Sequence, residues 1–275
     1  MDVDLPQLRL SFNRALSLAF SRKKLSITCA SLVAAGLMMV LCKGLLTNAS
    51  MWVALGLTFL FIFIDAAILL SVGIILVQVY RDEVRQIKVS YNKVIKNSLN
   101  VLLEVPFFSV PLIVGYLVLW LVLGLFFLVE KIPALGEILG IMLSFAPFLL
   151  VLFFILLCLL HIVVLFFLPP AVALSRLTRL RAFKMIFSRI TSDFFTNILL
   201  LSLAFIPVVI VTGVLVLTAF LCTPPNIEAF SVLGSTVRWF FIMVPFAIVL
   251  APAVSFFFNF SAEAYILTLN DTEIK

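Results

Sequence analysis

Ser90-Tyr91-Asn92-Lys93 precedes an apolar run from Val101 to Val129, and this pair of segments sets the architecture of the whole chain. A basic segment with an apolar stripe leads directly into a run long enough to cross a bilayer. The arrangement occurs earlier at Ser11-Phe12-Asn13-Arg14 and later around Ala182-Phe183-Lys184. We interpret the chain as three copies of one unit, a basic interfacial helix followed by a transmembrane hairpin.

Composition places the chain in a membrane. Of its 275 residues, 64% are hydrophobic and only 12% are charged, and its mean hydropathy is +1.30. Soluble domains carry about 25% charged residues, so these charges are too few to cover a water-facing surface. We expect one all-α integral membrane domain over residues 1–275, because no polar stretch is long enough to form a core of its own.

Six transmembrane helices are predicted, two in each unit. The units cover about 1–80, 81–170 and 171–275, and the spans cover about 25–46, 51–79, 101–129, 138–168, 195–222 and 236–258. Pro169-Pro170 is expected to end the fourth span, since prolines remove backbone donors and clash with the preceding turn.

The distribution of charge predicts the orientation. Sixteen of the 19 Lys and Arg residues fall in the N-terminal stretch, the two later basic stretches and the tail, and three fall in or beside the other loops. Cytoplasmic loops carry the excess of positive charge, so both termini are expected in the cytoplasm.

The repeat rests on one alignment. Ser11-Phe12-Asn13-Arg14 matches Ser90-Tyr91-Asn92-Lys93 at an offset of 79 residues, and the same offset places Gly36 on Gly115. The third unit keeps only the order aromatic, base, apolar run, proline and glycine. The alternative is that any two segments with a basic part and an apolar run look alike, and the sequence leaves both interpretations open.

The third unit resembles a known group of membrane domains. Leu168-Pro169-Pro170-Ala171, Arg181-Ala182-Phe183-Lys184 and Asp193-Phe194-Phe195 resemble a bacterial multi-pass membrane-domain group that includes the glycerophosphodiester phosphodiesterase membrane domain. The resemblance covers roughly residues 160–220. It implies a multi-pass protein of the bacterial inner (plasma) membrane without a catalytic site of its own. This chain lacks the soluble phosphodiesterase domain, so that activity is not implied.

Three polar residues inside predicted spans form a candidate intramembrane site: Asp65, His161 and Glu104. A carboxylate at the centre of a span costs roughly 2.5–3.5 kcal/mol on insertion scales. Asp65, expected near the middle of span 2, is therefore either a proton, cation or substrate site or a polar packing residue. His161 is either a proton shuttle or a satisfied interhelical donor, and Glu104 is expected near the cytoplasmic interface.

Basic side chains in the three segments are candidate contacts for anionic lipid, at about 1 kcal/mol for each Lys or Arg near the surface. They are Arg14, Arg22, Lys23, Lys24, Arg85, Lys88, Lys93, Lys96, Arg176, Arg179, Arg181, Lys184 and Arg189. The competing explanation is that these basic residues only determine the orientation of the protein in the membrane. The bilayer and its anionic headgroups are the expected partners; nucleic acid is not expected, and any protein partner is unknown.

Motifs for catalysis are missing from the sequence. It has no phosphate-binding loop, dinucleotide fingerprint, zinc-protease motif or nucleophile elbow. One histidine and no clustered carboxylates leave no expected metal site or cofactor. We therefore expect a non-enzymatic envelope, scaffold or lipid-associated protein. The alternative is a transporter or lipid carrier that uses a polar path at Asp65 and His161.

Overall fold

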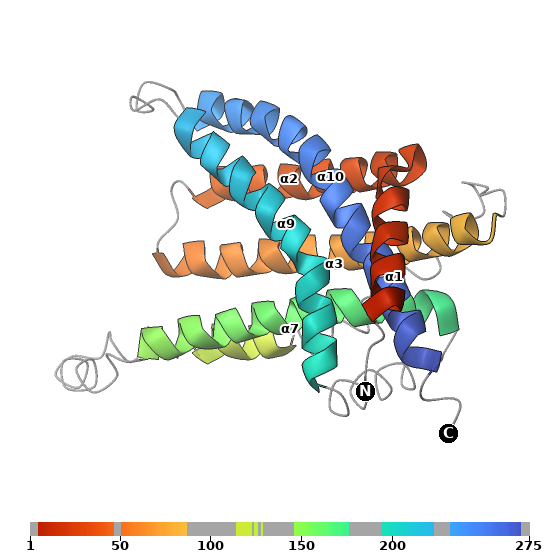
Figure 1. The fold of residues 1–275 in the computed structure, drawn as a ribbon. Coiled ribbons are helices and arrows are strands. Elements are labelled where there is room, and N and C mark those ends of the chain that lie inside the picture. The colour runs from red at the N-terminus through yellow and green to blue at the C-terminus, as the bar shows by residue number, and fades with distance from the viewer. Residues whose placement is uncertain are drawn as a thin grey trace.

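The structure, a computed structural model, describes residues 5–46, 51–86, 114–122, 124–125, 128, 146–175, 194–222 and 232–270. These residues form helices and short turns and include no strand, as Figure 1 shows. The all-α prediction is confirmed for this part of the chain. The elements are α1 (Leu5–Ser17), the short 3-10 helix η1 (Leu18–Phe20), α2 (Arg22–Leu46), α3 (Met51–Val84), α7 (Ala146–Ser175), α9 (Phe194–Cys222) and α10 (Val232–Asn270).

Five helices contain a segment long and apolar enough to cross a membrane, and they correspond to five of the six predicted spans. The segments are Arg22–Leu46, Gly56–Val84, Val151–Leu174, Phe195–Cys222 and Val237–Leu267. The third predicted span, 101–129, lies largely outside the described residues, although 114–122 within it are helical. Large apolar side chains are exposed on these helices, as on helices that face lipid rather than water. These features indicate a membrane protein.

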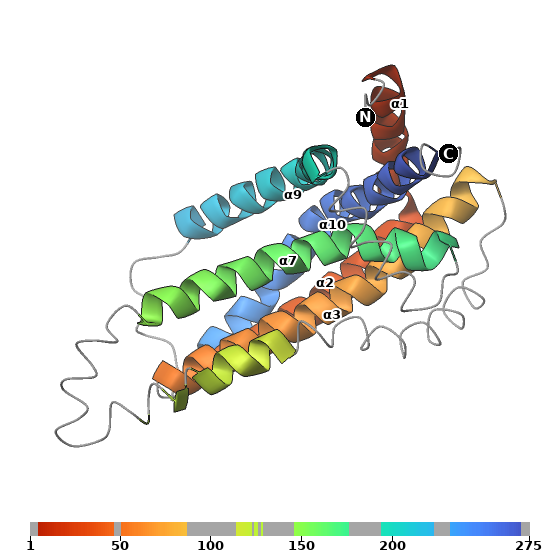
Figure 2. The same ribbon diagram turned by 90° about the horizontal axis from the view of Figure 1, so that it is seen from below.

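α2 and α3 pack against each other and run antiparallel. Lys24, in the first turn of α2, has its Nζ 2.7 Å from Oε2 of Glu83, in the last turn of α3. Figures 1 and 2 show the two helices side by side.

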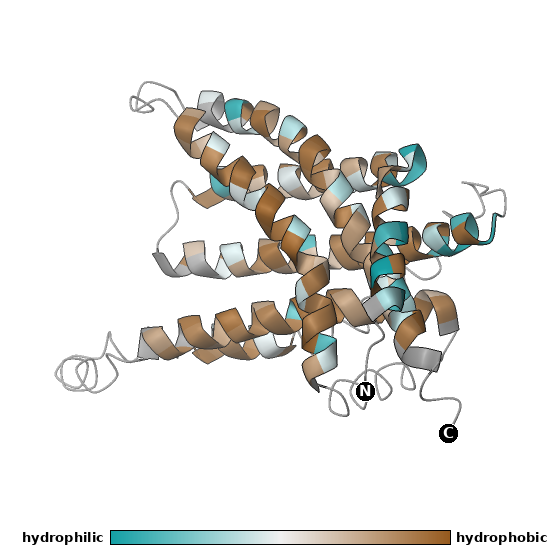
Figure 3. Cartoon of the chain, in the orientation of Figure 1, coloured by the Kyte–Doolittle hydropathy of each residue, from teal (hydrophilic) through white to brown (hydrophobic). Residues whose placement is uncertain are grey.

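We call the end of the bundle around Lys24, Glu83 and Asn259 the polar end. Figure 3 shows hydrophilic residues concentrated on α1 and on the ends of α2 and α3 that meet there. The opposite end contains Lys43, whose Nζ lies 3.8 Å from the centroid of the Trp239 ring.

α7 runs parallel to α3 and also ends at the polar end. Phe59 stacks on Phe154 with ring centroids 4.2 Å apart. Nearer the polar end, Arg81 Nη1 donates a hydrogen bond of 3.1 Å to the Ala173 carbonyl. Because both contacts pair residues in the same order along the two helices, α3 and α7 are parallel and are not the two helices of one hairpin.

The helical residues 114–122 run in the opposite direction beside α3. Trp120 lies against Gly56, near the start of α3, whereas Tyr116 meets Phe63 further along it, with ring centroids 5.7 Å apart.

α10 is the central helix of the described bundle. It contacts α1, η1, α2, α3, α7 and α9, and every residue from 253 to 265 is buried. Figures 1 and 2 show it crossing the bundle between α2 and α9. Gly73 on α3 lets the Phe258 ring approach closely, because a Cβ atom at this position would overlap that ring.

Pro169 and Pro170 do not end their helix, contrary to prediction. α7 continues through both prolines to Ser175. The proline ring holds φ near the helical value, so only two backbone hydrogen bonds are lost. Neighbouring helices support the segment, since Phe166 is 1% and Ala171 is 0% exposed.

The last helix is longer than predicted. The sixth span was expected to end at 258, followed by a short tail, but α10 continues to Asn270. Residues 259–265 of this extension are buried, and Asn259 and Phe260 are fully so. Polar residues in this stretch find partners on neighbouring helices, which the hydropathy of a single segment does not reveal.

α1, which belongs to the basic segment of the first predicted unit, lies across the polar end of the bundle. Figures 1 and 2 both show its axis crossing the direction of α2 and α3. Phe12 packs α1 against α10: its ring lies 5.1 Å from that of Phe256 and 5.9 Å from that of Phe260, centroid to centroid. Ala15 on α1 and Ala19 on η1 are buried as well.

Candidate functional site

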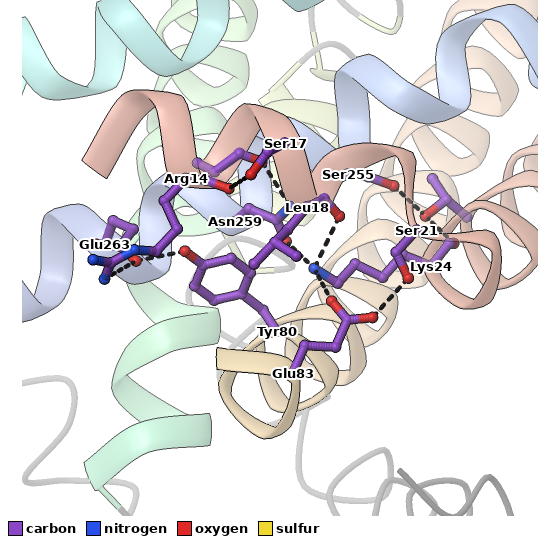
Figure 4. Close-up of polar contacts among 12 residues, drawn as sticks. Arg14, Ser17, Leu18, Ser21, Lys24, Tyr80, Glu83, Ser255, Asn259 and Glu263 are labelled. Carbon is purple, nitrogen blue, oxygen red and sulfur yellow. Dashed lines mark hydrogen bonds and ion pairs between the residues drawn. The ribbon is translucent and has the colours of Figure 1, made fainter. Parts of the chain in front are cut away.

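Lys24 is the centre of a buried polar network at the polar end, shown in Figure 4. Its side chain is 0% exposed and its Nζ forms the ion pair with Glu83. Nζ also donates to Asn259 Oδ1 at 3.1 Å and to the Leu18 carbonyl at 3.2 Å. Three acceptors compensate the ammonium for the water that it has lost.

The partners of Lys24 are themselves held by further hydrogen bonds. Ser21 Oγ donates to Glu83 Oε1 at 2.6 Å, and Asn259 Nδ2 donates to the Ala15 carbonyl at 3.1 Å. One helical turn along α2, the hydroxyls of Thr28 and Ser255 lie 3.0 Å apart. The network therefore connects α1, η1, α2, α3 and α10.

Tyr80 links this network to a second acidic residue. Its ring lies below the Lys24 ammonium, 4.6 Å from Nζ to centroid. Its hydroxyl donates to Glu263 Oε1 at 2.5 Å, and Arg14 Nη1 lies 3.5 Å from the same oxygen. A cation above the ring and a carboxylate at the hydroxyl hold Tyr80 at both ends.

A cavity of about 600 Å³ lies beside the network. Its polar lining comes from Arg14 on α1, from α3 and from Glu263 on α10, and its apolar lining includes Leu174 on α7. The full lining is Arg14, Tyr80, Arg81, Asp82, Val84, Arg85, Leu174, Ala262, Glu263 and Ile266. Three arginines face two carboxylates, so the lining carries an excess of one positive charge.

The structure places the predicted lipid contacts in different environments. Arg14, Arg22 and Arg85 are exposed, and Lys23 is partly buried. Lys24 differs from the expectation: it is fully buried and paired with Glu83, so its ammonium does not face headgroups. The other predicted contacts lie outside the described residues: Lys88, Lys93, Lys96, Arg176, Arg179, Arg181, Lys184 and Arg189.

Asp65 and His161 are both buried, at 9% and 5% exposed. Within the described residues, Asp65 Oδ1 and both ring nitrogens of His161 have no hydrogen-bond partner. The His161 ring meets Phe63 on α3, with centroids 6.2 Å apart. Asp65 follows two residues later, which turns its side chain by about 200° around the helix. The structure therefore does not bring these two predicted site residues together, and Glu104 lies outside the described residues.

Asp65 lies near the middle of α3: it is 14 residues from the first residue, Met51, and 19 from the last, Val84. Eighteen residues, roughly 27 Å along a helix, separate it from Glu83 at the polar end.

Tyr80, Glu83, Asn259 and Glu263 are functional candidates that were not predicted from the sequence, although a signal was present. Ser255, Asn259 and Glu263 recur every four residues, which places them on one face of an otherwise apolar helix. Such a stripe indicates polar partners on a neighbouring helix. No group of three or more metal-ligating side chains occurs among the residues that the structure describes.

Comparison with known proteins gave no match to a family model, to a curated protein or to a solved structure.

Proposed function

We propose that this chain is a non-enzymatic, lipid-associated, multi-pass protein of the bacterial inner membrane, with both termini in the cytoplasm. The observation that carries the proposal is the segregation of charge. Arg14, Arg22 and Arg85 are exposed at the polar end, whereas apolar side chains cover the exposed surface of the spans. Positive charge on one face suits the anionic cytoplasmic leaflet.

The spacing of charges along α2 supports a transmembrane arrangement. Lys24 at the polar end and Lys43 at the opposite end are 19 residues apart, roughly 28 Å along a helix. This is close to the hydrocarbon thickness of a bilayer, about 30 Å. Lys43 stacks on Trp239, and tryptophan is typical of the membrane–water interface.

The directions of the helices support six spans. α3 ends at the polar end, and α7 starts at the opposite end and returns to the polar end. The chain between them has to cross the bundle an odd number of times. The described residues 114–122 run antiparallel to α3, in the direction that one crossing by the predicted span at 101–129 requires.

The first unit supports the proposed repeat. α1 crosses the direction of the bundle and α2 and α3 form an antiparallel pair, as expected for an interfacial helix followed by a hairpin. The corresponding basic segments of the second and third units lie mostly outside the described residues. The repeat and the resemblance to the bacterial membrane-domain group therefore stay predictions.

A carrier has less support. The path predicted for it joins Asp65 on α3 to His161 on α7. His161 meets the face of α3 that carries Phe63, whereas Asp65 points about 200° around the helix from Phe63. Neither lines the cavity at the polar end. Asp65→Asn removes the ionisable group with little change of volume. Unchanged transport by this variant at normal membrane levels would argue against the carrier. A loss of transport at the same levels would favour it.

The experiment that tests lipid association compares the protein in nanodiscs with and without an anionic phospholipid. We expect the Tm to rise with phosphatidylglycerol and the gain to fall as salt is added, because salt screens exposed charge. An equal Tm in purely zwitterionic nanodiscs would contradict the proposal.

A further inference from the structure

The cavity at the polar end combines two features that one class of ligand requires together. We propose that it binds one anionic phospholipid, with the phosphate at Arg81 and Arg85 and the start of an acyl chain against Ile266 and Leu174. This inference rests on the proposed lipid association and adds to it a defined site with a defined stoichiometry.

The guanidinium groups provide the phosphate site. Arg81 is held by Asp82 Oδ1 at 3.4 Å and by the Ala173 carbonyl, so it is fixed at the cavity wall. Arg85 follows one helical turn later, lines the same cavity and is exposed. Its side chain has no ion pair or hydrogen bond to another described residue. Guanidinium forks match phosphate oxygens in geometry and charge.

The Glu263 carboxylate in the cavity lining already has partners within the protein. Glu263 Oε1 accepts the Tyr80 hydroxyl and lies 3.5 Å from Arg14 Nη1. These contacts offset the negative charge of Glu263, so its repulsion of an incoming phosphate is reduced. The free cation in the described lining is Arg85, at the mouth.

The remaining wall is apolar, which distinguishes a lipid from a soluble phosphate. Val84, Leu174, Ala262 and Ile266 line it, and Val84 and Ile266 are each 42% exposed. A free phosphate ion gains nothing from this surface, whereas an acyl chain buries it. The volume of about 600 Å³ lies within the range of small-ligand sites.

The position of the cavity fits the same ligand. Arg85 lies two residues beyond Glu83 and Ile266 three residues beyond Glu263, at the end of the bundle where the charged residues gather. A phospholipid in the cytoplasmic leaflet presents its phosphate at this level and its chains toward the apolar body of the bundle.

The test is native mass spectrometry of the full chain, delipidated in detergent and titrated with phosphatidylglycerol, phosphatidylcholine or inorganic phosphate. We expect one phosphatidylglycerol to bind per chain, ahead of phosphatidylcholine. Arg85→Ala should weaken this binding about tenfold, and Arg85→Lys less. Ile266→Trp should weaken it by filling the cavity. The matched control is Arg9→Ala, an exposed arginine that does not line the cavity.

The outcomes separate the site from the proposed function. Equal losses for Arg85→Ala and Arg9→Ala would overturn the site, while lipid association through general charge would stand. Displacement of the lipid by inorganic phosphate at a similar concentration would assign the arginines to a soluble phosphate and overturn the lipid assignment. No preference for the anionic lipid in the unmodified protein, together with no gain of Tm in nanodiscs, would contradict the site and the proposed function together.

Discussion

Lys24 Nζ and Glu83 Oε2 lie 2.7 Å apart at the polar end, in an ion pair whose lysine side chain is 0% exposed. The pair joins the first turn of α2 to the last turns of α3, and Asn259 brings α10 to the same ammonium. Breaking one half of a buried pair leaves an uncompensated charge, whereas replacing both halves by apolar groups is often neutral or stabilising.

Lys24→Met should therefore destabilise the bundle by about 3 kcal/mol, because Glu83 loses its cation and Asn259 and Leu18 lose a donor. The double variant Lys24→Met, Glu83→Leu should recover a large part of this loss. Thermal unfolding in detergent measures both. Arg22→Ala, two residues earlier and exposed, is the control and should change the Tm little. A single variant as stable as the control would mean that the pair contributes nothing.

Gly73→Ala should loosen the contact between α3 and α10. The added methyl group overlaps the Phe258 ring, which is 2% exposed and has no space to retreat. Overpacking of this kind costs about 1–3 kcal/mol. Gly213→Ala is the matched control, since a Cβ there meets no atom within 4 Å. The two Tm values measured side by side decide the matter, and equal values would contradict the close approach of α3 and α10.

Phe12→Ala should release α1 from the bundle while the spans stay folded. The ring contributes two edge-to-face contacts to α10, with Phe256 and Phe260, and its loss should cost roughly 1–3 kcal/mol. Hydrogen exchange measured over residues 5–17 should rise in this variant. Leu10→Ala should not have this effect, because Leu10 is 64% exposed. Unchanged exchange in Phe12→Ala would show that α1 is held by other contacts.

The six-span topology predicts which engineered cysteines an impermeant maleimide reaches in intact cells. Lys43→Cys and Lys131→Cys should be labelled from outside, and Arg22→Cys and Lys93→Cys only after permeabilisation. Lys131 lies between the predicted third and fourth spans, so protection of Lys131→Cys would remove a crossing from the proposal. The background for this experiment replaces the four native cysteines, Cys29, Cys42, Cys158 and Cys222, with serine.

The sequence was sufficient to predict the helices and not how they meet. Apolar runs predicted the five described spans. This works because a helix in lipid satisfies its own backbone, so a long apolar run is sufficient to identify it. The ends of the helices depend on neighbours instead. Pro169 and Pro170 were expected to stop α7, but packing against adjacent helices supports the segment. α10 continues past 258 because Asn259 and Glu263 find partners on α1, α2 and α3.

The candidate site shows the same limit. Lys24 belongs to a run of three basic residues, Arg22-Lys23-Lys24, and the sequence gives no reason to separate them. The helix does so, because successive residues point about 100° apart. One of the three points to Glu83 in the interior, and Arg22 stays exposed. Asp65 and His161 illustrate the reverse case: each is unusual in its own helix, but Asp65 points away from the face of α3 that His161 meets.

The central position of α10 has a consequence for biosynthesis. Helix α10 contacts α1, η1, α2, α3, α7 and α9, and it is made after all of them, since it begins at residue 232. Until it inserts, Lys24 lacks Asn259, Tyr80 lacks Glu263 and Thr28 lacks Ser255. A nascent chain that stops short of α10 therefore presents polar groups with missing partners to lipid or to quality-control proteases. These groups gain the partners on α10 only after that helix has been made, so a product truncated before α10 is marked by its own incompletely paired residues.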